Sequence, residues 1–96
     1  MILQDILYKV SIRSAKGNTH VEVKSLAIDS RTVKPGSCFI AVRGTKADGQ
    51  SFIQSAIEKG AIAVVCETFP ENINEAVTYV QVENAAGAAG YMSHNF

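Results

Sequence analysis

The sequence predicts an α/β fold, a small mixed and largely parallel sheet with flanking helices. Two observations carry this prediction. Residues 38–42 and 61–66 are continuously apolar, as expected for strands that are buried on both faces. Between them, apolar residues recur at helical spacing. Strand, helix and strand over residues 38–66 therefore form a βαβ unit, which is expected to be parallel and right-handed.

Shorter elements are predicted before this unit. Apolar residues at helical spacing predict a short amphipathic helix over residues 2–9. The polar segment 14–19 is expected to be a loop, and the alternating segment 20–24 is expected to be an edge strand. A short apolar run follows at 26–28. The Pro-Gly pair within residues 33–36 indicates a turn, because Pro fixes one φ and Gly permits a positive one.

The helix of the βαβ unit has a predicted cap at each end. The carboxylate of Asp48 can accept hydrogen bonds from the first free amides, and Gly60 can close the last turn. One face of the helix is apolar and consists of Phe52, Ile53, Ala56 and Ile57. This face is expected to pack on the sheet residues Phe39, Ala41, Ala63 and Val65. Phe52→Ala is accordingly expected to cost about 3–5 kcal/mol of stability.

The last third of the sequence predicts a loop, a strand and a helix. Residues 69–72 are expected to form the loop and the alternating residues 77–82 the strand. Asn84 can cap a final helix whose apolar side is made of Ala85, Ala88, Ala89, Met92 and Phe96. That helix runs to the end of the sequence without a terminating signal, which we interpret as a truncated chain.

The composition predicts one globular domain of ordinary type. The chain has 96 residues, of which 47% are hydrophobic, and its nine basic and nine acidic residues cancel. A nucleic-acid partner is therefore not expected. Cys38 and Cys66 are expected to be reduced core thiols, and His20 and His94 lie too far from them in the sequence to suggest a metal site. No signal peptide and no membrane span is expected, so the predicted location is cytoplasmic.

Residues 29–61 carry the most specific pattern, D-S-R-x3-P-G-x2-F-I-A-V-x-G-x3-D-G-x2-F-I-x2-A-I-x2-G-A. This pattern resembles the N-terminal, uridine-nucleotide-binding domain of the Mur ligases. These enzymes add amino acids to the UDP-muramoyl precursor of bacterial peptidoglycan. The resemblance covers about a third of the chain without a gap, and weaker agreement continues to Phe96.

Two loops of this pattern are candidate binding segments, because ligands of open α/β sheets bind beyond the carboxyl ends of strands. The resemblance implies that the UDP moiety is held by Ile28, Ser30, Thr45, Lys46 and Ala47. Ile28 is expected to belong to the core and to form an apolar floor for the ligand at the same time.

The residues of both loops also have alternative interpretations. The hydroxyl of Ser30 could instead cap a turn, the side chain of Lys46 could simply be solvated, and Asp48 fits a helix cap better than a ligand contact. Arg31 could reach a phosphate, or it could pair with Asp29 or Asp48.

The resemblance also implies a larger parent enzyme. In that parent, a central domain binds ATP and Mg²⁺, and a C-terminal domain selects the amino acid. The phosphate-loop pattern G-x4-G-K-[ST] does not occur in the 96 residues, so no catalytic residue is assigned and the chain alone is expected to be inactive. Residues 1–83 are expected to be the UDP-binding domain, and residues 84–96 the start of a linker helix to the ATPase domain.

The implied substrate is UDP-MurNAc-dipeptide. The segments 82–86 and 91–96 resemble more closely the family member that adds the third residue of the peptide, meso-diaminopimelate or Lys. The alternatives are the member that adds D-Ala-D-Ala and a stand-alone nucleotide-binding module.

Overall fold

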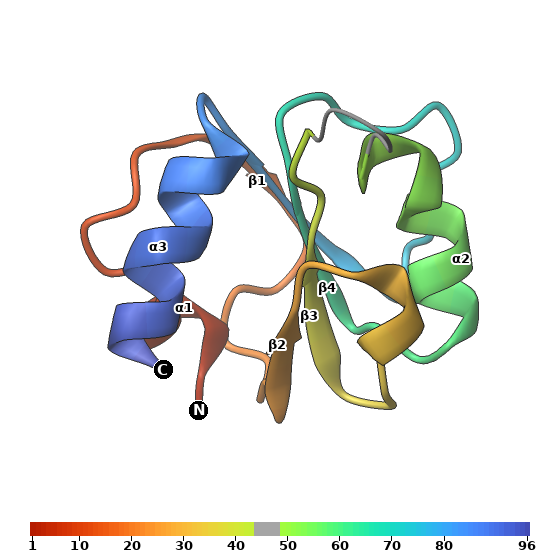
Figure 1. Ribbon diagram of the computed structural model, residues 1–96, viewed down its shortest axis with the longest axis horizontal. Coiled ribbons are helices and arrows are strands. Elements are labelled where there is room, and N and C mark those ends of the chain that lie inside the picture. The colour runs from red at the N-terminus through yellow and green to blue at the C-terminus, as the bar shows by residue number, and fades with distance from the viewer. Residues whose placement is uncertain (44–48) are drawn as a thin grey trace.

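The computed structural model describes residues 1–43 and 49–96 and shows a five-stranded sheet between two helical layers (Figure 1). The strand order is β1-β5-β4-β3-β2. Strands β2, β3, β4 and β5 are parallel to one another, and β1 pairs antiparallel with β5 at one edge of the sheet. The strands are β1 Ile12–Lys16, β2 Ser25–Ala27, β3 Ser37–Ile40, β4 Ala63–Cys66 and β5 Thr78–Val82. The predicted mixed, largely parallel sheet is confirmed.

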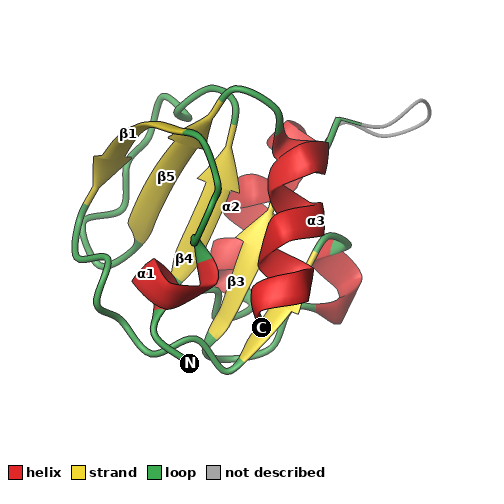
Figure 2. Cartoon of the chain, turned by 90° about the vertical axis from the view of Figure 1, so that its left-hand side faces the viewer, coloured by secondary structure: helices red, strands yellow, loops and turns green. Residues whose placement is uncertain are grey.

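Three α-helices and two 3-10 turns complete the described elements. They are α1 Leu3–Ile6, η1 Ser30–Thr32, η2 Gly49–Phe52, α2 Ile53–Glu58 and α3 Ala85–Asn95. Helices α1 and α3 cover one face of the sheet, as Figure 2 shows, and α2 lies on the other face. None of the described helices is long and apolar enough to span a membrane.

The predicted βαβ unit is present. β3 and β4 are adjacent parallel strands, with Cys38 opposite Ala63, and α2 connects them. Gly60 ends the helix with φ of +107°, as predicted for a left-handed cap. A side chain there would be doubly unfavourable, since a Cβ on Gly60 would also lie 2.7 Å from Cα of Pro35. The end of α2 is thereby fixed against the turn that precedes β3.

The central strands are buried on both faces and therefore serve two separate cores. In β3, Cys38 and Ile40 point to the α1 and α3 side, whereas Phe39 points to the α2 side. The same alternation puts Ala63 and Val65 of β4 on the α1 and α3 side. The expectation that these two residues pack against α2 was therefore wrong, because neighbouring positions of a strand face opposite ways.

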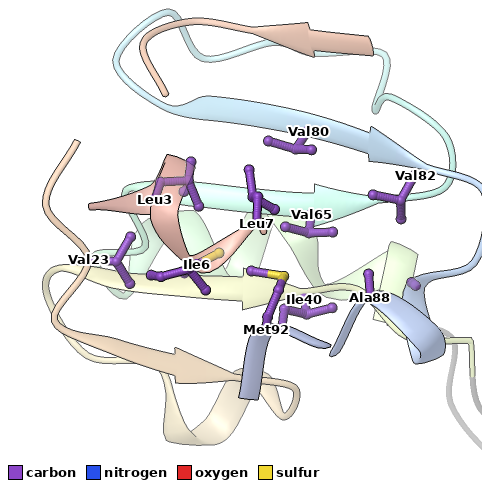
Figure 3. Packing of buried hydrophobic residues seen from close by; sticks show 13 residues of the cluster. Leu3, Ile6, Leu7, Val23, Ile40, Val65, Val80, Val82, Ala88 and Met92 are labelled. Atoms are coloured by element: carbon purple, nitrogen blue, oxygen red, sulfur yellow. The ribbon is translucent and has the colours of Figure 1, made fainter. Parts of the chain in front are cut away.

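Helix α3 is bound at both of its ends. The side chain of Asn84 accepts a hydrogen bond from the amide of Gly87 at 3.0 Å, which confirms the predicted cap. Near the other end, Nδ2 of Asn95 donates to the carbonyl oxygens of Ile6 at 2.9 Å and Tyr8 at 2.7 Å. Figure 3 shows α1 and α3 contributing to one apolar cluster on the sheet.

The first 24 residues differ most from the prediction. The predicted loop 14–19 begins with part of β1, whose side chains are all exposed and so give no apolar signal. β1 is instead specified by backbone pairing with β5, for example Ala15 opposite Val80. The predicted edge strand 20–24 is wrong, because among the described residues this segment forms only an isolated bridge between Ile2 and Glu22. The helix predicted over 2–9 is shorter, since Lys9 already has φ of +68°.

Candidate functional site

A cleft of about 490 Å³ lies at the carboxyl ends of β2 and β3. It is lined by Ile28, Asp29, Ser30, Arg31, Phe39, Val42, Gly49 and Phe52. The first four follow β2, and the last two are the first and last residues of η2, which follows β3. The cleft is therefore at the edge where a parallel sheet is expected to bind its ligand. The structure brings the predicted residues Ile28 and Ser30 together in it.

Ser30 is the most enclosed polar group of the cleft, with 9% of its surface exposed. Its hydroxyl makes no hydrogen bond within the described part of the chain. The turn is capped instead by Asp29, whose Oδ1 accepts a hydrogen bond from the amide of Arg31 at 2.9 Å. The alternative in which Ser30 caps the turn is therefore not what the structure shows. The hydroxyl remains available as both donor and acceptor.

Asp29 and Arg31 form an ion pair at the mouth of the cleft. Nε of Arg31 donates to both carboxylate oxygens of Asp29 at 3.1 Å, and the terminal nitrogen donates to Oδ2 at 2.7 Å. The Arg31 guanidinium, by these hydrogen bonds, lowers the pKa of Asp29 to about 2. Of the partners that the sequence left open for Arg31, the structure shows Asp29. The arginine side chain is nevertheless 85% exposed, so it can reorient at little steric cost.

Two large apolar side chains border the cleft and remain open to solvent. Ile28 is 62% exposed and Phe52 is 39% exposed. The expected core positions of both side chains are therefore wrong. Phe52 is the last residue of η2 and the N-cap of α2, so it stands at the start of the helix, where its ring lines the cleft. An aliphatic and an aromatic side chain flanking a polar hydroxyl suit a planar ring that carries hydrogen-bonding groups at its edge.

Gly49 brings the start of the helical segment against the end of β3. Its amide donates to the carbonyl of Val42 at 3.0 Å. A Cβ on Gly49 would lie 2.7 Å from both the nitrogen and the oxygen of Val42, so a side chain would push the segment away. The glycine of the Asp-Gly pair is therefore required by close packing at this position.

Four residues of the second predicted loop lie outside the described residues. They are Thr45, Lys46 and Ala47, expected to contact the UDP moiety, and Asp48, expected to cap the helix. These expectations remain predictions. Val42 and Gly49, which precede and follow this segment in the sequence, both line the cleft.

The two cysteines are buried in the cores of the protein and are not a reactive pair. Cys38 and Cys66 are buried and unpaired, as predicted, and burial raises the pKa of these thiols to about 12 and about 11. Such thiols are poor nucleophiles at neutral pH. Among the described residues no group of His, Cys, Asp and Glu side chains could hold a metal ion.

A larger cavity, of about 620 Å³, lies beside the N-terminal end of α3. The carboxylates of Glu67 and Glu83 line it, and Oε2 of Glu67 already accepts a hydrogen bond from the Ala85 amide at 2.9 Å. Lys9 also lines it, but two carboxylates repel a phosphate, and the amides of Ala85 and Gly87 at the helix start already donate to Glu67 and Asn84. The smaller cleft at Ser30 is thus the better candidate for an anionic ligand, although it is not the largest hollow.

Comparison with known proteins relates the chain to the Mur ligases, both by a family profile and by individual relatives. The profile described as "Mur ligase family, catalytic domain" matches residues 22–96. A ligase of Cytophaga hutchinsonii named UDP-N-acetylmuramoyl-L-alanyl-D-glutamate–2,6-diaminopimelate ligase is 50% identical over 97 residues, which cover 100% of this chain and 20% of that protein. A Phocaeicola vulgatus protein of the same name is 40% identical over 96 residues, with the same coverage. The chain spans about a fifth of the length of these curated relatives.

Solved structures are similar in fold. A crystal structure of MurF from Acinetobacter baumannii superposes with a TM-score of 0.68 at 21% identity, covering 78% of this chain and 16% of that one. MurF ligase from Thermotoga maritima, solved in complex with ADP, gives a TM-score of 0.64 at 27% identity and covers 74% of this chain and 16% of that one.

Proposed function

Because the chain belongs to the Mur ligase family, we propose that it binds the uridine nucleotide of UDP-MurNAc-L-Ala-D-Glu for the rest of a larger ligase. The proposal rests on one observation above all. An enclosed, unbonded hydroxyl, that of Ser30, lines the same cleft as the exposed side chains of Ile28 and Phe52, at the carboxyl edge of a parallel sheet.

The chemistry of the cleft fits a uracil ring. The ring offers two apolar faces, which Ile28 and Phe52 can contact, and carbonyl and N–H groups at its edge, which the Ser30 hydroxyl can contact. Stacking of a base on an aromatic side chain contributes about 1–3 kcal/mol. We assign further contacts with the UDP moiety to Thr45, Lys46 and Ala47, as the family resemblance implies. We expect the backbone amides of these residues, rather than their side chains, to donate hydrogen bonds to the UDP moiety.

ATP and Mg²⁺ do not fit the residues at hand. The 96 residues contain no phosphate loop of the type G-x4-G-K-[ST], and the described residues contain no acidic cluster suited to a metal ion. We therefore assign both to the central domain of the parent enzyme and derive no reaction step here. Residues 1–83 form the nucleotide-binding unit in this proposal, and residues 84–96 lead toward the central domain. Use of a UDP-linked precursor agrees with the cytoplasmic location expected from the sequence.

The reaction we propose for the whole enzyme is addition of the third peptide residue. The relatives that cover this whole chain are named as ligases for 2,6-diaminopimelate, which favours this amino acid over Lys. MurF, which the solved neighbours represent, shares the fold but only 21–27% of the sequence. The amino acid is selected outside these 96 residues, so its identity is tested on the longer protein.

The proposed nucleotide site can be tested by titrating the 96-residue chain with UDP and following amide shifts by NMR. We expect the shifts to cluster at residues 28–31 and 42–52, with a Kd of about 100 µM to 1 mM. Ser30→Ala should weaken binding by about 1–3 kcal/mol without unfolding the chain, since one hydrogen bond to the ligand is lost. Ser11→Ala, at an exposed serine outside the cleft, is the matched control. Shifts clustered on α3, or unchanged affinity of Ser30→Ala, would refute the site.

A further inference from the structure

The backbone carbonyl of Ser30 is held from outside its own turn. Nζ of Lys59 donates a hydrogen bond to this oxygen at 3.1 Å, between residues 29 positions apart. The other bond to the same oxygen comes from the Val33 amide at 3.4 Å and closes η1. A hydrogen bond from a charged donor is stronger than one between neutral groups. The ammonium group of Lys59 therefore adds a charged hydrogen bond between the Ser30 turn and the C-cap of α2.

Lys59 reaches Ser30 from a fixed backbone. It is the C-cap of α2, directly after Glu58, and its amide donates to the carbonyls of Ser55 and Ala56, each at 3.1 Å. The next residue, Gly60, is packed against Pro35. A cation at the C-terminal end of a helix is also favoured by the helix dipole. The backbone that carries the Lys59 side chain is thus held by α2 before it and by the contact of Gly60 with Pro35 after it.

The two cations near Ser30 have different partners. Arg31 pairs with the carboxylate of Asp29 and accounts for most of the lowering of its pKa. Lys59 lowers that pKa too, but its effect is the smallest of the causes. Its direct contact is with the Ser30 carbonyl. Removing Lys59 therefore disturbs Ser30 more than it disturbs the ion pair.

We propose that Lys59 is a positioning residue, which directs the Ser30 hydroxyl toward the ligand in the cleft by fixing the Ser30 carbonyl. The carbonyl carbon and Cβ are both bonded to the same Cα. Holding the planar peptide unit therefore restricts ψ of Ser30 and with it the direction of the Cα–Cβ bond, from which the hydroxyl projects. The inference rests on the proposed function, in which UDP is the ligand. It adds a residue outside the cleft that determines affinity.

The test compares three variants by UDP titration. Lys59→Met keeps the length of the side chain and removes its donor, so the Kd for UDP should rise about three- to tenfold. Lys59→Arg keeps a cationic donor and should restore most of the affinity. Lys34→Met removes the same charge from an exposed residue outside the cleft and should change the Kd less than twofold. Amide spectra of each variant establish that the fold is retained.

Two further readouts separate positioning from attraction of the phosphates by a nearby cation. Positioning predicts the same fold-loss for uridine, which has no phosphate, as for UDP. It also predicts that Lys59→Met costs nothing further in a Ser30→Ala chain, because both changes remove one interaction. A loss seen with UDP alone, or full additivity of the two changes, would overturn the inference.

Failure of this inference is distinct from failure of the proposed function. If the unmodified chain binds no UDP, the proposed function fails and this inference fails with it. If the unmodified chain binds UDP and Lys59→Met binds it equally well, only the inference is overturned.

Discussion

The two faces of the sheet are built from alternate residues of the same strands, but their helices cover them to different extents. We call the α1 and α3 face the closed face and the α2 face the open face. On the α1 and α3 face, an eleven-residue helix covers the central strands, and every buried member of the cluster is at most 5% exposed (Figure 3). On the α2 face the α-helix has six residues, and the surface ends at the exposed side chains of Ile28 and Phe52.

This difference separates stability from binding. Apolar side chains on the closed face are removed from water and contribute to folding. On the open face, two large apolar side chains remain exposed around an unbonded hydroxyl. Exposed apolar groups that surround polar ones are typical of ligand sites. Substitutions on the two faces should therefore have opposite profiles, one affecting unfolding and the other affecting UDP affinity.

The largest expected effect is on the closed face. Ile40 is fully buried between the sheet and α3, so Ile40→Ala should lower the free energy of unfolding by about 2–5 kcal/mol. Urea denaturation measures this change. The Kd for UDP, measured where the variant is still folded, should be unchanged. A loss below about 1 kcal/mol would contradict the packing described for this face.

Phe52→Ala should show the reverse profile. The ring is 39% exposed, so the variant should lose less than about 1 kcal/mol of stability, well below the value expected from its sequence pattern. Loss of a stacking surface should weaken UDP binding by about 1–3 kcal/mol. Thermal unfolding and UDP titration of the same sample give both numbers. A large drop in Tm with unchanged UDP affinity would contradict the assignment of Phe52 to binding rather than to stability.

Asn84→Ala tests the end of α3 on the closed face. The cap hydrogen bond to Gly87 is lost, which should cost about 0.5–1 kcal/mol, toward the lower end for a cap. The reason is that Glu67 still binds the amide of Ala85. Chemical denaturation is the measurement, and Asn72→Ala, in an exposed loop, is the control. UDP affinity should not change, because α3 lies on the face opposite the cleft.

The smallest expected effect is the pH dependence of the ion pair between Asp29 and Arg31 at the mouth of the cleft. The pKa of Asp29 is lowered to about 2 by Arg31, so the stability from this pair is fully present above the ordinary pKa of 3.8. It is lost as the pH falls toward 2, where the carboxylate becomes protonated. In Arg31→Gln, the titration midpoint of Asp29, followed by carboxyl-carbon NMR, should move upward toward 3.8. A midpoint that stays near 2 would show that another group holds the carboxylate.

Patterns over continuous apolar runs predicted the central elements correctly. Burial on both faces forces the strand segments 38–42 and 61–66 to be apolar, and helical spacing of apolar residues marks the helix between them, so strand, helix and strand were all visible in the sequence. Exposed β1 was missed, since its position depends on backbone pairing with β5 and no side-chain pattern reports such pairing. Helical periodicity grouped Phe52 with Ile53, but it does not show where the sheet under a helix ends.

The cleft was predictable in part. Ile28 and Ser30 follow a strand at the carboxyl edge, and this placement, with the family pattern, pointed to them. Lys59 gave no signal, because it acts on a backbone carbonyl 29 positions away and a lysine at a helix end is ordinary. A contact between a side chain and a backbone group that is distant in the sequence can be recognised only in the folded structure.

The central claim is that the open face, and no other surface, receives the uridine ring. Intermolecular nuclear Overhauser effects from the H5 and H6 protons of UDP measure this most directly. We predict effects to the ring of Phe52 and the methyl groups of Ile28. Effects to Tyr8 or Tyr91, which line a separate cavity of about 560 Å³ beside α3, would contradict the account.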